Sequence, residues 1–214
     1  MNNLFQFDEN FNKIIIGTDE AGRGPAAGGV FVGAVCFREK SETLINELSG
    51  INDSKKLSKK RRETLFNIIK ENTINSVICI GVKEIEEINI LNASLKGMKL
   101  TCEAVLAQLH LAPDTEFLTL VDGNKLIKDY PYPQKYIIKG DGTSASIAAA
   151  SILAKVTRDR YMEKLDAEFP QYGWAKNAGY LTHEHLSAID KYGLTPYHRP
   201  SFLQNHFNKQ LSLL

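Results

Sequence analysis

The 214-residue sequence has few cysteines, no long apolar run and no excess of charge of either sign. Its three cysteines, Cys36, Cys79 and Cys102, lie far apart in apolar stretches, which excludes a disulfide framework and a cysteine zinc cluster. We expect buried free thiols in a reducing compartment. No run approaches the ~18 apolar residues of a membrane span, and no signal peptide begins the chain. We therefore expect a cytoplasmic protein without membrane attachment.

The balance of charges excludes a protein that coats nucleic acid through bulk charge. Lys and Arg number 26 and Asp and Glu 25, so a net charge of +1 leaves room only for a local basic patch. The 43% of hydrophobic residues is close to the globular average and excludes a disordered chain. The length predicts one domain, which needs no disulfide or structural metal. We expect a monomer, because nothing indicates a large apolar interface.

The apolar pattern predicts an α/β fold with a mixed sheet. The first two predicted strands are joined without a helix and should be antiparallel, whereas later strands alternate with helices and should add in parallel. Ser58 and Thr182 are predicted helix N-caps. The segment 200–214 is amphipathic. The predicted strands are 14–18, 29–37, 76–82, 116–122 and 135–139, and the predicted helices are 58–71, 89–109, 144–166 and 182–192.

Acidic residues at the ends of predicted strands are the first candidates for a site, because sites form at strand ends in α/β sheets. Asp19 and Glu20 follow the first strand, Asp122 ends the fourth, and Asp159 lies in the long helix. Converging carboxylates repel one another, and a hard divalent cation relieves that repulsion. With no His or Cys beside them, Mg²⁺ or Mn²⁺ fits better than Zn²⁺. Each acid alone could equally be a turn or capping residue.

The residues after the first strand should shape the site. Adjacent residues of a regular strand face opposite sides, so Asp19 and Glu20 can share a metal only if the strand ends or distorts between them. Gly22, Arg23 and Gly24, followed by a proline, supply a reason for such a distortion. This glycine loop also exposes backbone groups that could read a ligand hydroxyl. A lone Gly-x-Gly is more often just a turn.

Basic and aromatic residues offer further candidates. Six of the eight residues 55–62, Lys55 and Lys56 among them, are Lys or Arg. Taken alone, such a segment is more often a solvated helix start, but cations there oppose the helix dipole, and phosphate contacts would supply a compensating gain. The amides of 139–144, which lead into the long helix, could hold an anion. Tyr180 could be a core residue or could stack on a sugar or base.

The two histidines near Tyr180 are weaker candidates. His183 and His185 lie two residues apart on a predicted helix and therefore point in different directions. They are poor joint metal ligands for that reason. We expect surface or capping roles for both.

Taken together, the motifs resemble the bacterial ribonuclease HII family, which is a type 2 ribonuclease H. They occur in the family's order over most of the chain. The related type III enzymes resemble it less well, because they carry a different glycine loop and an extra N-terminal domain. The matching strings are DEAGRGP at 19–25, INDSKKLS at 51–58, VDG at 121–123, KGD at 139–141, SIAAASILAKVTRDR at 146–160 and HRPSF at 198–202.

The resemblance implies a ribonuclease H-like fold, with a mixed central sheet flanked by helices and a helical C-terminal extension. One catalytic domain would span 1–214, with the core over about 1–175 and the extension over about 176–214. The implied activity is endonucleolytic cleavage of the RNA strand in RNA–DNA hybrids and 5′ of single ribonucleotides in duplex DNA. The products would carry 5′-phosphate and 3′-hydroxyl ends.

The resemblance also assigns roles residue by residue. Two divalent ions, Mn²⁺ or Mg²⁺, would flank the scissile phosphate, one activating the attacking water and the other stabilising the leaving oxygen. The glycine loop would contact the 2′-hydroxyl and Tyr180 would stack at the RNA–DNA junction, while Lys55 and Lys56 lie in the segment that would hold flanking phosphates. Asp141 and Arg199 receive no firm role. The catalytic, metal-binding carboxylates would be Asp19, Glu20, Asp122 and Asp159.

Two departures from the family pattern leave these assignments intact. Ala178 stands where the family often has lysine, and residues 26–31 replace a commoner PLAGPV continuation. Neither change touches a catalytic group. The alternatives are another metal-dependent nuclease of the same fold, which would not need the glycine loop, and a non-catalytic hybrid-binding module, which would not need four acids. Whether 203–214 docks a partner such as a sliding clamp is left open.

Overall fold

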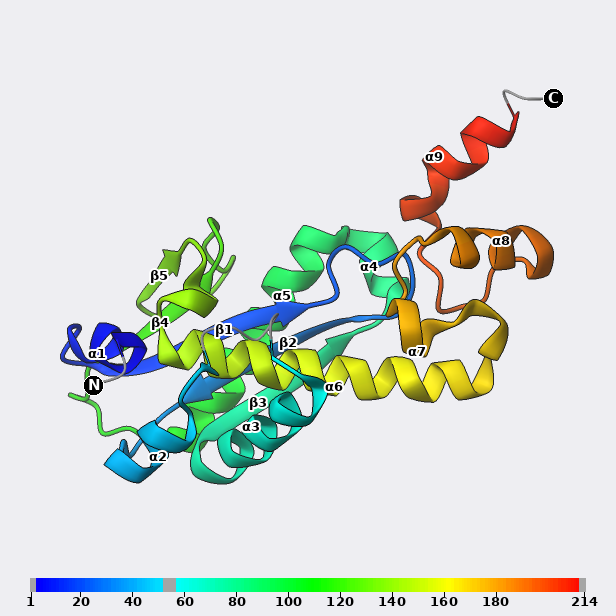
Figure 1. The fold of residues 1–214 in the computed structure, drawn as a ribbon. Helices are drawn as coiled ribbons and strands as arrows, with labels where there is room; N and C mark the ends of the chain where they lie inside the picture. Colours follow the sequence, from blue (N-terminus) through cyan, green and yellow to red (C-terminus); the bar gives the residue numbers. More distant parts are fainter. Residues whose placement is uncertain (1–2, 52–56, 212–214) are drawn as a thin grey trace.

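A mixed five-stranded sheet forms the centre of the computed structural model, which describes residues 3–51 and 57–211 (Figure 1). The strand order is β3-β2-β1-β4-β5. Helix α6 packs on one face of the sheet and α5 on the other. The expected α/β class with a mixed sheet is confirmed. The strands are β1 (Ile14–Ala21), β2 (Val30–Cys36), β3 (Ile74–Ile80), β4 (Phe117–Asp122) and β5 (Gln134–Ile137).

The strand directions follow the sequence prediction with one exception. β1 and β2 are antiparallel, and β4 and β5 add in parallel on the other side of β1. β3 pairs antiparallel with β2, so the expected parallel addition is wrong for this strand. The reason is that β2 itself runs opposite to β1. A strand returning through a helix can therefore be parallel to β1 and still antiparallel to its own neighbour.

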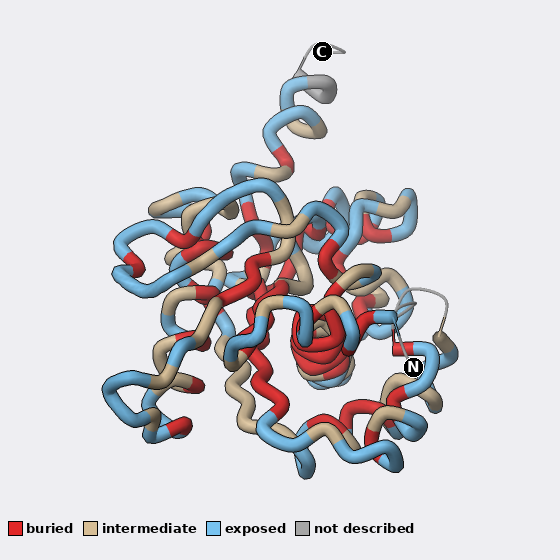
Figure 2. The backbone as a smooth tube through the Cα atoms, turned by 90° about the vertical axis from the view of Figure 1, so that its left-hand side faces the viewer, coloured by how far each residue is buried: buried red, intermediate tan, exposed pale blue. Residues whose placement is uncertain are grey.

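Helix α6 (Ala145–Glu168) is the central element of the molecule. Figure 2 looks along it and shows a buried coil surrounded by the rest of the chain. Glycines on the strands let the sheet approach this helix closely. A Cβ on Gly17 of β1 would lie 2.2 Å from the Ser146 backbone, and one on Gly33 of β2 would lie 2.5 Å from the Ala150 carbonyl oxygen. The position of α6 against β1 and β2 is thus fixed by backbone contact.

The first turn of α6 is held by acceptors from the protein itself. Ser144 caps the helix by accepting from the amide of Ile147. Asp8 accepts from the amide and the hydroxyl of Ser146, at 2.9 and 2.8 Å. Because the Asp8 carboxyl is fully buried, desolvation raises its pKa even though these hydrogen bonds lower it.

Helix boundaries agree with the sequence prediction where the apolar pattern extends over several turns. Ser58 and Thr182 cap their helices as expected. Four short helices lacked a clear period and were not predicted. The expected burial of all three thiols is wrong for Cys79, which is exposed on β3. The unpredicted helices are α1 (Asn3–Glu9), α2 (Glu42–Glu47), α4 (Val82–Ile88) and α7 (Trp174–Asn177), and the longer ones are α3 (Lys59–Asn72), α5 (Ile90–Leu109) and α8 (His183–Tyr192).

The chain after α6 packs back onto the end of that helix. Met162 and Leu165 of α6 form one apolar cluster with Trp174 and Leu203. Helix α9 extends outward from this cluster (Figure 1), and its His206 contacts Asp190 of α8 at 2.7 Å. The elements of this extension besides α8 are η3 (Pro170–Tyr172), α7 (Trp174–Asn177) and α9 (Pro200–Leu211). Of the helices in the described part of the chain, none has the length and apolar character needed to cross a bilayer.

Replacing Gly17 with alanine is expected to lower the free energy of unfolding by about 1–3 kcal/mol, because the added methyl group overlaps the α6 backbone. Gly81→Ala is the control, since Gly81 lies next to a strand of the same sheet, has a φ of −75° and has open space where its Cβ would lie. Denaturant unfolding of both variants measures the difference. Equal stability of the two would contradict the close approach of β1 and α6.

Candidate active site

The strand register places two of the predicted acids side by side. β1 and β4 are parallel, and the last pair of their ladder joins Thr18 to Val121. One step further along both strands lie Asp19 and Asp122, which therefore extend from the same face at the same sheet edge. Asp19 is 6% exposed, so its carboxylate is almost completely removed from water.

Glu20 reaches the same site although β1 does not end before it. The ladder to β2 continues through Glu20 to Ala21, so the expected end or distortion of the strand between Asp19 and Glu20 is wrong on that side. The ladder to β4, in contrast, stops at Thr18. Beyond Thr18, β1 therefore has no neighbouring strand on the β4 side. Asp19 and Glu20 both line the cavity that lies next to this unpaired part of the strand.

Burial and mutual repulsion disfavour the charged forms of these three acids. Desolvation is the main cause that raises the pKa of Asp19, and the charges of Glu20 and Asp122 raise it further. Desolvation also raises the pKa of Glu20, although its ion pair with Arg23 at 3.2 Å opposes the shift. The pKa of Asp122 is raised by desolvation and lowered by the amide of Gly140, which donates to it at 2.7 Å.

The motif at 139–144 holds a carboxylate of the protein itself. The amides of Gly140, Asp141 and Gly123 all bind Asp122, so the anion that this motif was expected to hold is the Asp122 side chain. A side chain at residue 140 would crowd the same carboxylate, because its Cβ would lie 3.1 Å from Asp122 Oδ1. The segment thus fixes the acid that ends β4.

The carboxylates open into a cavity of about 680 Å³. Ser151, Lys155 and Arg158 of α6 contribute to its wall, and the sequence analysis missed them as site residues. Their spacing of four and three was the available signal, because it places them on one helix face. Ser151 also donates to Asp19. The other lining residues are Asp19, Glu20, Ala21, Gly22, Arg23, Gly24, Arg62, Asp122, Lys139, Asp141 and Tyr180.

Asp159 stands apart from the other three acids. It accepts from Lys155 at 2.6 Å, and Arg62 lies 4.0 Å away. It lines a neighbouring cavity of about 250 Å³, whose wall shares Lys155 and Arg62 with the larger one. The fold therefore brings Asp19, Glu20 and Asp122 together and pairs Asp159 with the ammonium of Lys155 beside them.

The basic segment is largely engaged within the protein. Lys59 pairs with Glu163, and Arg61 donates to the carbonyls of Glu47 and Ser49. These contacts offset the unfavourable position of the cations at the start of α3. Lys55 and Lys56 lie outside the described residues.

The glycine loop lies directly against Tyr180. Gly22 has a φ of +99°, and a Cβ there would overlap the side chain of Arg158. A Cβ on Gly24 would lie 3.3 Å from the Tyr180 ring. Tyr180 is 54% exposed, which excludes the core alternative and leaves its ring accessible at the mouth of the cavity.

A buried histidine pair supports the segment that carries Tyr180. His185 is fully buried, so the expected surface or capping role is wrong for it. Its Nδ1 donates to the carbonyl of Tyr180 at 2.9 Å, and its Nε2 accepts from Trp174 at 3.0 Å. His198 accepts from the amide of Thr195 and donates its Nε2 proton to His185 at 3.2 Å. Both rings are neutral in this network, because an added proton would face another donor.

The donor set fits a hard divalent cation in kind. Asp19, Glu20 and Asp122 offer only oxygen atoms as ligands, and a bound cation would stabilise the charged forms that their burial disfavours. Within the described ranges, no three His, Cys, Asp or Glu side chains are already arranged as a metal site. The three acids are thus suitable ligands by chemistry and location.

Comparisons with known proteins agree on one family. The sequence model of the family described as Ribonuclease HII matches residues 16–210. The chain is 50% identical over 200 residues to the Ribonuclease HII of Rickettsia africae (strain ESF-5), a match that covers 93% of this chain and 96% of the relative.

Solved structures agree with the fold. Ribonuclease H2 from Pyrococcus horikoshii OT3 superposes with a TM-score of 0.68 at 28% identity, over 87% of this chain and 92% of that one. The RNase HII in a PCNA complex from Archaeoglobus fulgidus also gives 0.68, at 24% identity, over 87% and 93% of the two chains. The expected ribonuclease H-like architecture with C-terminal helices is confirmed.

Acidification is expected to destabilise the fold through the histidine pair. Burial lowers the pKa of His198 from its ordinary 6.5 to about 4. Between these values the unfolded chain binds more protons than the folded one, so the free energy of unfolding falls as the pH drops from 6.5 to 4. Denaturant unfolding across this range should show a contribution of about 1 kcal/mol per pH unit that His198→Gln removes. His183→Gln, at an exposed position, should keep the wild-type slope, and identical slopes in both variants would contradict the neutral pair.

Proposed function

The chain belongs to the ribonuclease HII family and is an endoribonuclease of the ribonuclease H type, and we propose that it cleaves both RNA–DNA hybrids and duplex DNA containing single ribonucleotides. The family supports action on the RNA of RNA–DNA hybrids. The finer proposal includes a cut 5′ of the ribonucleotide that leaves 5′-phosphate and 3′-hydroxyl ends. The observation that carries it is the union of the acid cluster, the glycine loop and Tyr180 in one cavity.

We propose that Asp19, Glu20 and Asp122 hold two divalent ions, Mn²⁺ or Mg²⁺, together with Asp159. When bound, such ions activate water and stabilise the leaving oxygen of a phosphodiester. Asp122 is fixed for this role by the Gly140 amide, and Asp19 by Ser151. Asp159 is proposed on the family resemblance, since its present partner is Lys155.

The 2′-hydroxyl is the only covalent feature that marks one ribonucleotide in DNA, so the protein must read it directly. We propose that backbone groups of Gly22, Arg23 and Gly24 make this contact. Tyr180 would stack on the adjoining nucleotide, because its exposed ring lies against Gly24 beside the acids. A binding site built in this way explains selectivity for ribose without any reading of base sequence.

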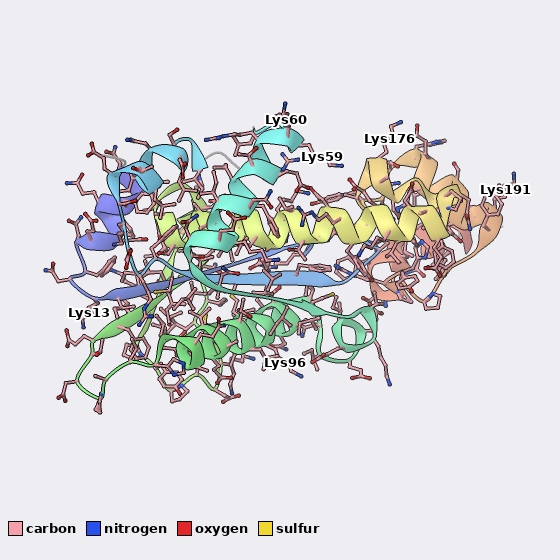
Figure 3. All side chains as sticks on the ribbon, turned by 90° about the horizontal axis from the view of Figure 1, so that it is seen from below. Lys13, Lys59, Lys60, Lys96, Lys176 and Lys191 are labelled. Carbon is pink, nitrogen blue, oxygen red and sulfur yellow. The ribbon has the colours of Figure 1, made fainter. Side chains whose placement is uncertain are left out.

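Flanking phosphates would bind cations around the cavity. Arg62, Lys139 and Lys155 line it together with the acids. Figure 3 shows that Lys59 and Lys60 extend from the same side of the molecule as Lys176, opposite Lys96. We propose that the nucleic acid backbone crosses this side, and that Lys55 and Lys56 add to the same contact.

We also propose that the enzyme acts as a monomer. A single domain would span residues 1–214. The extension from about residue 176 packs on the core, because Leu203 belongs to the same apolar cluster as Met162 and Leu165 of α6. The solved structure of the Archaeoglobus fulgidus relative is that of a complex with PCNA. Contact of this chain with a sliding clamp through its last residues is a proposal of the same kind.

A cleavage assay on an end-labelled DNA duplex with one ribonucleotide tests the proposed activity. We expect a cut 5′ of the ribonucleotide with Mg²⁺ or Mn²⁺, no cut in EDTA and no cut in an all-DNA duplex. Asp122→Asn should lose about a hundredfold or more, because a metal ligand contributes several kcal/mol to the transition state. It should also unfold at a higher temperature than wild type in EDTA, since the mutation removes a buried charge whose pKa is raised.

Asp114→Asn, which changes an exposed acid far from the cavity, is the control and should match wild type in both readouts. Cutting of the all-DNA duplex would move the protein to another nuclease activity of this fold. Full activity of Asp122→Asn would remove that residue from the proposed metal site.

Tyr180→Ala is expected to lose about tenfold or more in kcat/KM on the single-ribonucleotide duplex, which is the size of one stacking contact. The loss on a long RNA–DNA hybrid should be smaller, because many ribose positions there can be cut. Tyr192→Ala is the control, since Tyr192 has a similar exposure of 52% and lies on α8. Equal losses on the two substrates would contradict a role at the RNA–DNA junction.

A further inference from the structure

Arg199 is buried in contact with the glycine loop and has no assigned role. It is fully buried, and its guanidinium donates to three backbone carbonyls. These are Gly28 through Nε at 2.8 Å, Arg23 through Nη1 at 3.2 Å and Gly22 through Nη2 at 2.8 Å. In the described part of the chain, no carboxylate forms a salt bridge with this guanidinium. The side chain is therefore committed to the loop backbone.

These contacts set the direction of the loop amides. The described chain contains no cis peptide bond, and in a trans peptide the C=O and the following N–H point in opposite directions. Holding the Gly22 carbonyl therefore turns the amide of Arg23 away from Arg199. Holding the Arg23 carbonyl does the same for the amide of Gly24. Neither amide donates to an acceptor among residues 3–51 and 57–211, and both residues line the cavity.

The loop is fixed from its other side as well. Arg158, 2% exposed, donates to the carbonyls of Ala27 at 3.1 Å and Ala178 at 3.0 Å. The amide of Ala26 donates to Gly179 at 2.9 Å, next to Tyr180. The chain after the glycine loop and the tyrosine segment are thus joined directly by one backbone hydrogen bond and through the side chain of Arg158.

We propose that Arg199 is a positioning residue that aims the amides of Arg23 and Gly24 at the 2′-hydroxyl oxygen of the ribonucleotide. The proposal rests on the proposed function, because it assigns a cause to the ribose selectivity of the same site. A guanidinium is suited to this task, since its planar fork can serve three acceptors at once. Its charge also polarises the two peptide groups and strengthens their outward donors.

The alternative is that Arg199 only stabilises the extension. Its removal would then weaken every substrate equally, because less enzyme would be folded. If Arg199 aims the loop, its loss must instead reduce the affinity gained from a single 2′-hydroxyl. The phosphates are the same in a duplex with one ribonucleotide and in its all-DNA counterpart, so the ratio of their affinities isolates the hydroxyl.

The test uses the non-cleaving Asp122→Asn protein, titrated with each of the two duplexes. The parent should prefer the ribonucleotide duplex, and adding Arg199→Lys should reduce that preference by about tenfold, the size of one hydrogen bond, because an ammonium cannot hold three carbonyls in a plane. Leu203→Ala is the matched control, since Leu203 is fully buried in the same extension and belongs to the apolar cluster around Trp174. It should lower stability and leave the preference unchanged.

The outcomes separate the two proposals. A parent without any preference, together with a wild type that does not cut the ribonucleotide duplex, would overturn the proposed function and this inference with it. A preference that Arg199→Lys leaves intact would overturn the role of Arg199 alone. Equal weakening on both duplexes would mean that Arg199 only stabilises the fold, and would overturn the positioning role as well.

A second measurement covers the case in which Arg199→Lys does not fold. In the Asp122→Asn protein, the amide resonances of Arg23 and Gly24 should shift more with the ribonucleotide duplex than with the all-DNA duplex. The amide of Gly81, which lies away from the cavity, should respond to neither. Equal shifts of the two loop amides with both duplexes would overturn the proposal without any change at Arg199.

Discussion

Like charges held out of water are the constraint around which this molecule is organised. Asp19, Glu20 and Asp122 meet at one edge of the sheet, where burial raises the pKa of each and the charge of a nearby carboxylate raises it further. The surrounding structure supplies partial compensation through the Gly140 amide, the Ser151 hydroxyl and the Arg23 guanidinium. None of these removes the penalty. The folded chain thus retains an unfavourable concentration of negative charge that a divalent cation would relieve.

Two positive charges, those of Arg158 and Arg199, are also held out of water near the glycine loop. Arg158 and Arg199 are buried next to the glycine loop, and desolvation lowers the pKa of Arg199 to about 10. Their partners are carbonyl oxygens, which are weaker acceptors than carboxylates. A carboxylate would stabilise either arginine more but would occupy the donors that now hold the loop. Stability is lower than it could be at the two places where the proposed chemistry needs fixed groups.

Sequence reasoning identified what short-range patterns encode. The acids were recognisable because apolar runs of the sequence end just before Asp19 and Asp122, and the parallel register then brings the two acids together. The contact of Arg199 with Gly22 joins residues 177 positions apart, and no local period reveals it. The burial of His185 was equally hidden, since its partners come from separate turns. Local charge patterns also misled, because Lys59 and Arg61 find partners inside the protein.

The pairing of Ala27 with His198 has a consequence for the order in which the working enzyme is assembled. Synthesis proceeds from the N-terminus, so the strands that carry the acids emerge long before the residues that hold the glycine loop. A nascent chain can form the sheet and gather its carboxylates while the loop still lacks Arg199. The acidic cluster therefore depends on early parts of the chain, whereas the proposed reading of the ribose also depends on residues that are made later.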